Sequence, residues 1–452
     1  MRIRFILSVL SALLFSCSII AAEQEMPDSL YGVPWTLDRC VEYALEHNVD
    51  IKRKELSIKT KEVSISEGKW AFAPKFDFIT SGSSSSGRVL DETTYEFIMN
   101  SIVGSSSSSI SGTMDIFKGM NRVYALQRAR IDLQYESANI ESLYYEIRKS
   151  ITAAFLSALC AETNLESAKQ AKGLLITQLD RIAVLVEAGK VTESDYLQTK
   201  AQLYAAECDV VTAEGAVESS KMDLCQLLEI RDYSSFCITE NREISGEDKS
   251  LIRWEDIVET RPEYRSAQLA IEIARKDLAI AKSAYYPTIS LSVGYGSSFS
   301  TARQKTIQNP DGTFRFEAYP FLEQYLDNSN SYVSMSLNIP IFNAMSTHNS
   351  VRKQKIAVRD AEYAFLKAEK ELSKEYLQAK IDCQTAYKKY IAAQEQLKFA
   401  EEAERQVRER YELGVADFNA WNTAATELAK AKYSLSEAKY SYLFDLELLK
   451  IF

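Results

Sequence analysis

Apolar and polar residues alternate strictly in several segments of this chain. The alternation is clearest in "TISLSVGYG" from Thr288 and "SYVSMSLNIP" from Ser331, and it recurs in "KFDFIT" and "SISGTMDI" of the first half. A period of two predicts strands with one apolar face and one face of small polar residues. The sequence therefore predicts two β-hairpins, at about residues 74–117 and 287–342. A soluble sandwich and a membrane barrel both fit this pattern, and the Ser/Thr/Gly face suits a barrel interior.

Elsewhere the apolar period is seven. The stretch from about residue 345 to Leu413 contains neither glycine nor proline and predicts one helix of some 70 residues, about 100 Å long. A parallel segment runs from Gly119 to Gly189. Eight heptads with intervening charged residues predict coiled-coil packing. The apolar residues that recur at every seventh position form a heptad row, which consists of Val358, Phe365, Leu372, Ala379, Ala386, Ala393, Ala400 and Val407.

The chain also repeats itself. "GKWAFAPKFDF" around Pro74 matches "AKSAYYPTISL" around Pro287 at an offset of 213, whereas Gly189 matches Gly414 at an offset of 225. The twelve extra residues fall in "QNPDGTFRFEAYPFLEQ", whose Pro, Gly and aromatic content is typical of a long loop. Each half then consists of a helix, a β-hairpin, a long helix, a glycine turn and a shorter helix.

These boundaries define the expected domains. We expect a first repeat at residues 23–230, an acidic linker at 231–260 and a second repeat at 261–452. Residues 1–22 are typical of a secretory signal peptide, with a basic start, an apolar core and a small-residue cleavage site after Ala22. An alternative takes "LFSC" as a lipobox, which would leave a lipidated Cys17 at the mature N-terminus.

Composition excludes several kinds of function. The formal net charge of −10 argues against a nucleic-acid partner. His47 and His348 are the only histidines, and neither a GxSxG motif nor a phosphate-binding loop occurs, so we expect no enzyme, no cofactor and no metal. The remaining cysteines form no CxxC pair and are best interpreted as buried thiols, with Cys225 and Cys237 the only close pair able to form a disulfide.

Whether the mature chain can cross a membrane depends on its strands. After the signal peptide no segment offers 18 consecutive apolar residues, so a membrane crossing would require a barrel. Two hairpins supply four strands, which cannot close a barrel alone. A dimer would supply about 8 strands and a trimer about 12.

These features resemble the TolC-like outer-membrane efflux protein family. The resemblance is carried by "LDRCVEYALEHNVDIK" and "RPEYRSAQLAI" before the hairpins, "LNIPIFN" after the last strand and "YELGVADF" at the second turn. It implies a mainly α protein whose duplicated coiled-coil hairpins form a periplasmic tube, joined to a 12-stranded barrel in the outer membrane of a homotrimer. It further implies outer-membrane lipid as surroundings, and as partners a periplasmic adaptor and an inner-membrane pump of the RND or ABC type.

The resemblance also assigns the glycine turns. In the family these tips close the periplasmic entrance and receive the adaptor's helical hairpins, while a turn between helices needs no further role to explain its glycine. The residues that the resemblance places in contact with the adaptor are Ala188, Gly189, Lys190, Val191, Thr192, Leu413, Gly414, Val415, Ala416 and Asp417.

The entrance constriction departs from the family pattern. Family members place acidic residues six and nine positions after the second glycine, where this chain has Ala420 and Thr423. Asp195 stands six positions after Gly189, and we hypothesise that it forms a charged ring at the entrance of a trimer. The alternative is an ordinary solvated acid on a helix.

Aromatic residues gather where strands meet helices, and they fit either a membrane-interface girdle or core packing. They are Trp70, Phe72, Phe117, Tyr285, Tyr286 and Phe342.

The expected function is a passive outer-membrane exit duct of a tripartite efflux system that expels small molecules such as drugs, detergents or metal ions. Two alternatives remain: the duct of a type I protein secretion system, and a periplasmic coiled-coil scaffold or adhesin stalk. Deleting the gene and measuring toxicant susceptibility and the secreted proteome would separate the first two.

Overall fold

A computed structural model describes residues 34–90, 97–189, 191–231, 233, 236–240 and 258–451. The chain divides into two compact units. The first comprises Met1–Asn48, Ser150–Ser245 and Lys388–Phe444, and the second comprises Val49–Lys149, Gly246–Tyr387 and Asp445–Phe452. The predicted signal peptide, including Cys17, and most of the predicted linker at 231–260 lie outside the described residues.

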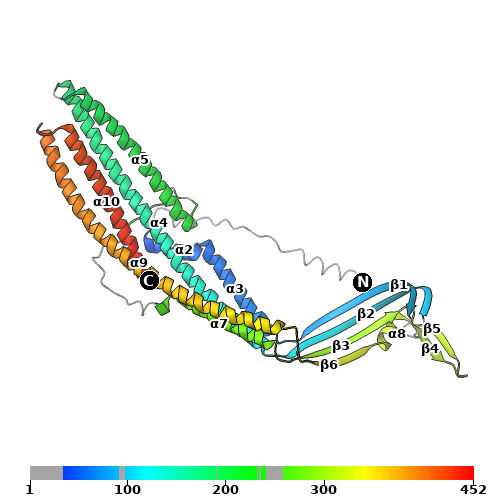
Figure 1. Cartoon of the computed structure of the whole chain (residues 1–452). Coiled ribbons are helices and arrows are strands. Elements are labelled where there is room, and N and C mark those ends of the chain that lie inside the picture. Colours follow the sequence, from blue (N-terminus) through cyan, green and yellow to red (C-terminus); the bar gives the residue numbers. More distant parts are fainter. Residues whose placement is uncertain are drawn as a thin grey trace. The chain divides into compact units, whose positions relative to one another are not determined.

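The second unit contains an antiparallel sheet of four strands in the order β1-β2-β3-β6 (Figure 1). The strands are β1 (Lys75–Leu90), β2 (Phe97–Lys118), β3 (Thr288–Ser300) and β6 (Asn330–Asn338). The alternating segments of the two halves thus pair with each other as well as within each hairpin, because β2 lies beside β3. Bulges interrupt the register between Gly87 and Val89 and between Asp115 and Phe117.

The extra residues of the second half are structured, so the expectation of a long loop is wrong. They form a two-stranded ribbon, β4 (Gln304–Gln308) with β5 (Phe314–Ala318), followed by the short helix α8 (Phe321–Asp327). Apolar and charged residues alternate in "FRFEA" of β5, which is the period-two signal of a strand. The turn residues Pro310 and Gly312 belong only to the connection between the two strands.

Each half of the second unit has a helix leading into the sheet and a long helix leading away from it. The incoming helices, α3 (Val49–Trp70) and α7 (Pro262–Ser283), both have 22 residues. A 3-10 turn at Val258–Thr260 precedes α7. Ion pairs join the helices: Lys61 Nζ lies 2.8 Å from Asp132 Oδ2, and Arg128 Nε lies 2.9 Å from Asp277 Oδ1.

The long helices α4 (Asn121–Glu187) and α9 (Ser346–Glu412) both have 67 residues. They are followed by α5 (Glu193–Leu227) and α10 (Phe418–Ile451). The predicted coiled-coil seam is confirmed, because every position of the heptad row in α9 is buried or half-buried. Small residues fill its centre, where Ala379, Ala386 and Ala393 are buried.

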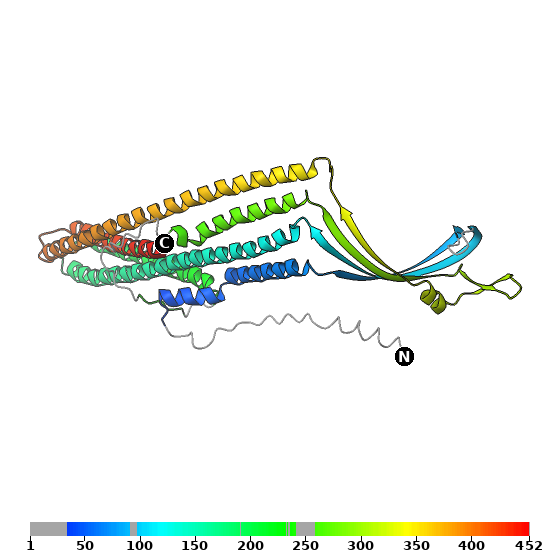
Figure 2. The same cartoon turned by 90° about the horizontal axis from the view of Figure 1, so that it is seen from below.

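The first unit packs parts of these four helices with α2 (Leu37–His47), which begins at the capping residue Thr36 (Figure 2). Its core includes Phe155, Leu224 and Tyr442. Cys40 and Cys225 are buried there, and burial raises the pKa of the Cys40 thiol to about 12, which keeps it protonated. Cys225 and Cys237, the pair considered for a disulfide, are not bonded to each other.

Across the described ranges, no helix is both long enough and apolar enough to cross a membrane.

Candidate functional site

The four-stranded sheet has two chemically different faces, and the strand register assigns each residue to one of them. Directly opposed residues of antiparallel strands point to the same face. Phe78, Ile110 and Tyr295 form one such row, and Met114, Leu291 and Met335 form another. The apolar face carries Phe76, Phe78, Ile110, Met114, Ile289, Leu291, Val293, Tyr295, Val333, Met335 and Leu337.

The opposite face consists mostly of hydroxyl side chains. Ser81 Oγ lies 2.8 Å from Ser107 Oγ, and Ser290 Oγ lies 2.6 Å from Ser336 Oγ, so neighbouring strands exchange hydrogen bonds there. The polar residues of this serine face are Asp77, Ser81, Ser83, Ser105, Ser107, Ser109, Ser111, Thr113, Asp115, Ser290, Ser292, Ser298, Ser300, Ser334 and Ser336, and Ile79 and Tyr332 are larger side chains among them. Such a surface suits contact with water, whereas the apolar face does not.

One charged group on the serine face is paired. Asp115 Oδ2 lies 3.1 Å from Arg122 Nη2, and the same guanidinium donates a hydrogen bond to the carbonyl oxygen of Asp115. In the sequence repeat Asp115 corresponds to Pro340 of the second half, and it lies beside the bulge in β2. The carboxylate therefore fastens the end of β2 to the start of α4.

The aromatic residues at the junctions of strands and helices are exposed, which contradicts core packing. Phe342, Trp70 and Tyr286 are the most exposed of them, and Ile341, which precedes Phe342 in the sequence, is also exposed. Exposed aromatic and aliphatic side chains of this kind fit an apolar or interfacial environment rather than bulk water.

The first predicted tip is a turn closed by Gly189. Its φ of +69° lies in the left-handed region, and its amide donates to the carbonyl of Val186 at 2.9 Å, as expected after a helix end. Ala188 and Gly189 are exposed and Val191 is half-buried. Lys190 lies outside the described residues.

The second predicted tip is a complete Schellman turn around Gly414. Gly414 has a φ of +72°, its amide donates to the carbonyl of Tyr411 at 3.0 Å, and the amide of Val415 donates to that of Arg410 at 2.8 Å. Leu413 and Val415 are exposed. Asp417 caps the next helix, because its Oδ1 accepts a hydrogen bond from the amide of Ala420 at 2.8 Å.

Asp195, the predicted constriction residue, has a local structural role. It forms a capping box with Thr192 at the start of α5: Asp195 Oδ2 accepts from Thr192 Oγ1 at 2.7 Å and from its amide at 3.2 Å. The carboxylate also acts on Tyr411, whose pKa is raised by burial and by the negative charge of Asp195. Asp195 thus lies near both glycine turns, and its part in a constriction stays a prediction.

Behind the tips lies an apolar cluster that the sequence analysis missed. Ile182 and Trp421 are its buried members, and Tyr411 stacks on Trp421 with ring centroids 5.9 Å apart. The partly buried members come from both hairpins: Val186, Val191, Tyr196, Val407 and Tyr411. The signal in the sequence was Trp421 itself, a large apolar residue between the two positions considered for family acids.

Polar contacts surround this cluster. Trp421 Nε1 donates to Glu404 Oε1 at 3.1 Å, and Arg408 Nη1 lies 3.7 Å from Glu404 Oε2, which satisfies a carboxylate that is only 8% exposed. At the surface, Arg181 Nη1 of α4 lies 3.1 Å from Glu412 Oε1 of α9. The two tips of one chain are thus held together by an apolar core with an ion pair beside it.

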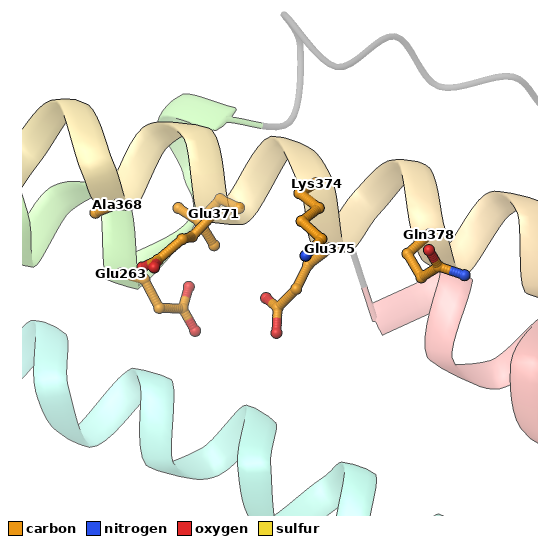
Figure 3. Close-up of a pocket in the computed structure, with 7 residues that line it drawn as sticks. Glu263, Ala368, Glu371, Lys374, Glu375 and Gln378 are labelled. Carbon is orange, nitrogen blue, oxygen red and sulfur yellow. The ribbon is translucent and has the colours of Figure 1, made fainter.

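The second unit also has a recess between α7 and α9, with a volume of about 470 Å³. Figure 3 shows the carboxylates of Glu263 and Glu375 pointing into it. Arg261 Nε lies 3.1 Å from Glu263 Oε2, which offsets one of the acids. Within the part of the chain that the structure describes, no group of three or more His, Cys, Asp or Glu side chains is placed to hold a metal.

Comparison with known proteins identifies relatives that cover most of the chain. TolC of Vibrio cholerae is 23% identical over 332 residues, which cover 70% of this chain and 68% of that protein. TolC of Escherichia coli is 24% identical over 365 residues, covering 75% of this chain and 67% of that protein. The crystal structure of the CmeC outer membrane channel of Campylobacter jejuni superposes with a TM-score of 0.77 at 16% identity, covering 92% of this chain and 84% of that one.

The model of the family described as outer membrane efflux protein matches residues 40–228 and 255–450. The two matched segments include both hairpins, both glycine turns and all four strands of the sheet. The chain therefore belongs to the outer membrane efflux protein family.

Proposed function

We propose that three copies of this chain form a passive exit duct of a tripartite efflux system in the outer membrane. The observation that carries the proposal is the sheet, which has an apolar face, a serine face and two edge strands, β1 and β6. Edge strands with unpaired backbone groups require partners in a membrane. Three sheets joined edge to edge would give about 12 strands, with the apolar faces toward lipid and the serine faces around a water-filled lumen.

The same proposal gives the helices and tips their roles. The hairpins of three chains would form a tube in the periplasm, and the two repeats, at 23–230 and 261–452, would each supply one helical hairpin per chain. The tips at Gly189 and Gly414 would face a periplasmic adaptor, which would connect the duct to an inner-membrane pump. Exposed Leu413 and Val415 at the second tip suit an apolar contact with such a partner. The pump, rather than this chain, would supply energy and select small-molecule substrates.

Conductance in a planar bilayer tests this proposal and the role of Asp195 together. We expect the purified protein to form discrete cation-preferring channels, and the variant Asp195→Asn to lose part of that preference. Asparagine removes the charge while its side-chain oxygen can still accept the hydrogen bonds that Thr192 donates, so the turn should be kept.

Asp195→Ala is the matched variant, because it removes the charge together with the hydrogen bonds that the Asp195 side chain accepts from Thr192. Equal cation preference in the wild type and Asp195→Asn would exclude the charged ring and leave the duct intact. No conductance in any preparation, including after adaptor is added, would contradict the duct and favour a scaffold.

A further inference from the structure

The short helix α8 covers a polar patch on the apolar face of the sheet. Tyr325 OH lies 2.9 Å from Ser106 Oγ and 3.3 Å from Ser108 Oγ, and Ser297 Oγ donates to the carbonyl of Tyr325 at 2.6 Å. By the register, Ser108 and Ser297 oppose each other and follow the row of Ile110 and Tyr295 on the apolar face. The helix therefore lies on the apolar side of the sheet, directly beyond its apolar rows.

The helix is fixed in this position by a buried amide. Gln324 is 1% exposed, its Oε1 accepts from the amide of Ser300 at 3.0 Å, and its Nε2 donates to the carbonyls of Ser300 at 3.0 Å and Tyr319 at 2.9 Å. Asn328 Nδ2 donates to the carbonyl of Ser298 at 2.8 Å. A short helix held by this many hydrogen bonds presents a defined outer surface.

That outer surface is apolar. Leu322 and Leu326, four residues apart and so on one side of the helix, are 73% and 75% exposed. Phe321 is also exposed, and its ring contacts those of Phe299 and Tyr325 in tilted arrangements, at centroid distances of 5.0 and 4.5 Å. The helix has two charged residues: Glu323 pairs with Lys305 of β4 at 2.9 Å, and Asp327 accepts a hydrogen bond from Tyr319 OH at 2.6 Å. The helix thus replaces serine hydroxyls by leucine side chains on this side of the sheet.

The apolar rows of the sheet are shorter than the apolar band of a membrane barrel. From Ile289 to Tyr295 the apolar face of β3 extends over six residue steps, about 20 Å along the strand and about 15 Å of height at a tilt near 40°. Membrane barrels present an apolar band about 25 Å tall. At the inner end, exposed Ile341 and Phe342 continue the band. At the outer end the next opposed residues of β2 and β3 are Ser108 and Ser297, and α8 covers them with an apolar surface.

We propose that α8 lies in the outer leaflet of the bilayer, with Leu322 and Leu326 inserted among the lipids at the edge of the apolar band. The inference rests on the proposed function, since it requires the apolar face to meet lipid. Burial of the two leucines in lipid would stabilise the outer end of the sheet in the membrane, and the covered serines would be shielded from the acyl chains.

Site-directed spin labelling in lipid vesicles tests this inference. Single cysteines replace Leu322 and Leu326 in a background where the more accessible Cys160, Cys208 and Cys237 are serine. Labels are measured for accessibility to oxygen, which concentrates in lipid, and to a water-soluble nickel chelate. We expect an oxygen-to-nickel accessibility ratio several-fold higher at 322 and 326 than at Asp311→Cys, which lies in the exposed turn of the β4–β5 ribbon.

Neighbouring residues of β6 are the matched controls. Met335→Cys labels the apolar face and Ser334→Cys labels the serine face. A lipid-like ratio at 335 with a water-like ratio at 322 and 326 would overturn the role of α8 while the proposed duct stands. Protection of both leucine positions from both reagents would show a protein contact and would overturn it as well. A water-like ratio at 335 would contradict the proposed membrane barrel itself.

Discussion

The two helical hairpins of this chain have nearly equal lengths but use different chemistry to hold their helices together. In the first, ion pairs connect α4 with α5: Lys169 with Glu214, Lys172 with Glu207, and Lys221 with Glu162, at 3.3, 3.1 and 2.7 Å. In the second, the contacts between α9 and α10 are aromatic, with Tyr390 stacked on Tyr442 and Trp421 bonded to Glu404. The ion pairs of Arg405 and Arg408 stay within α9.

The two halves of the chain share helix lengths and glycine turns, but they differ in the contacts between their helices. Both long helices have 67 residues, and both end at a left-handed glycine. The polar contacts between the helices are partly exposed ion pairs in the first hairpin, whereas aromatic rings make the contacts described in the second. Partly exposed ion pairs are weak and screened by salt, whereas a buried aromatic contact is not. The first hairpin should therefore open more easily, and salt should affect it more.

The largest expected effect comes from removing the tryptophan of the second hairpin. Trp421 is 6% exposed, and Trp421→Ala should lower local stability by about 3–5 kcal/mol, because it leaves a cavity and removes the donor to Glu404. Hydrogen exchange of peptides around residues 400–430 should accelerate. Exchange near Ile182 should also accelerate, because that residue shares the cluster.

Trp421→Phe is the control for that substitution. It keeps an aromatic ring against Tyr411 and removes the hydrogen bond from Nε1, so it should cost about 1–3 kcal/mol. Unchanged exchange in Trp421→Ala would show that the cluster does not hold the tips together.

The sequence predicts the features that depend on periodicity. The heptad row from Val358 marks the buried side of α9, and the alternation from Thr288 marks the two faces of β3, because each pattern directly reflects the geometry of its own element. Gly189 and Gly414 could be placed at turns for the same reason, since each follows a long uninterrupted helix.

Features that depend on contacts between elements could not be predicted. Trp421 meets Glu404 only because α9 and α10 fold back on each other, and Tyr325 meets Ser106 across 219 residues of sequence. The helix α8 was missed because seven residues are too few to show a helical period beside proline and glycine. The capping box of Asp195 differs from these contacts, because its pattern, T-x-x-D, is local and can be seen in the sequence.

Alanine substitution of the two glycines should have an intermediate effect. No atom lies within 4 Å of an added Cβ at Gly189 or Gly414, so each alanine would be strained only by its positive φ. We expect a loss of about 1 kcal/mol at each site, seen as faster hydrogen exchange of the adjoining turn. A clearly larger loss at either position would indicate a contact made in the assembled protein.

The smallest expected effect comes from removing single ion pairs, one that connects two helices of a hairpin and one that lies within a helix. Glu162→Gln removes the charge that faces Lys221 of α5, and Glu402→Gln removes the charge that faces Arg405 of the same helix. At low salt, Glu162→Gln should destabilise α5 by about 0.5 kcal/mol, seen as faster hydrogen exchange over residues 193–227. Glu402→Gln should leave exchange of α10 unchanged, because its partner lies on α9.

At about 1 M salt, where the screening length falls to about 3 Å, the effect of Glu162→Gln should largely vanish. An effect of equal size at both salt concentrations would mean that packing of the Lys221 stem, rather than its charge, holds the first hairpin together.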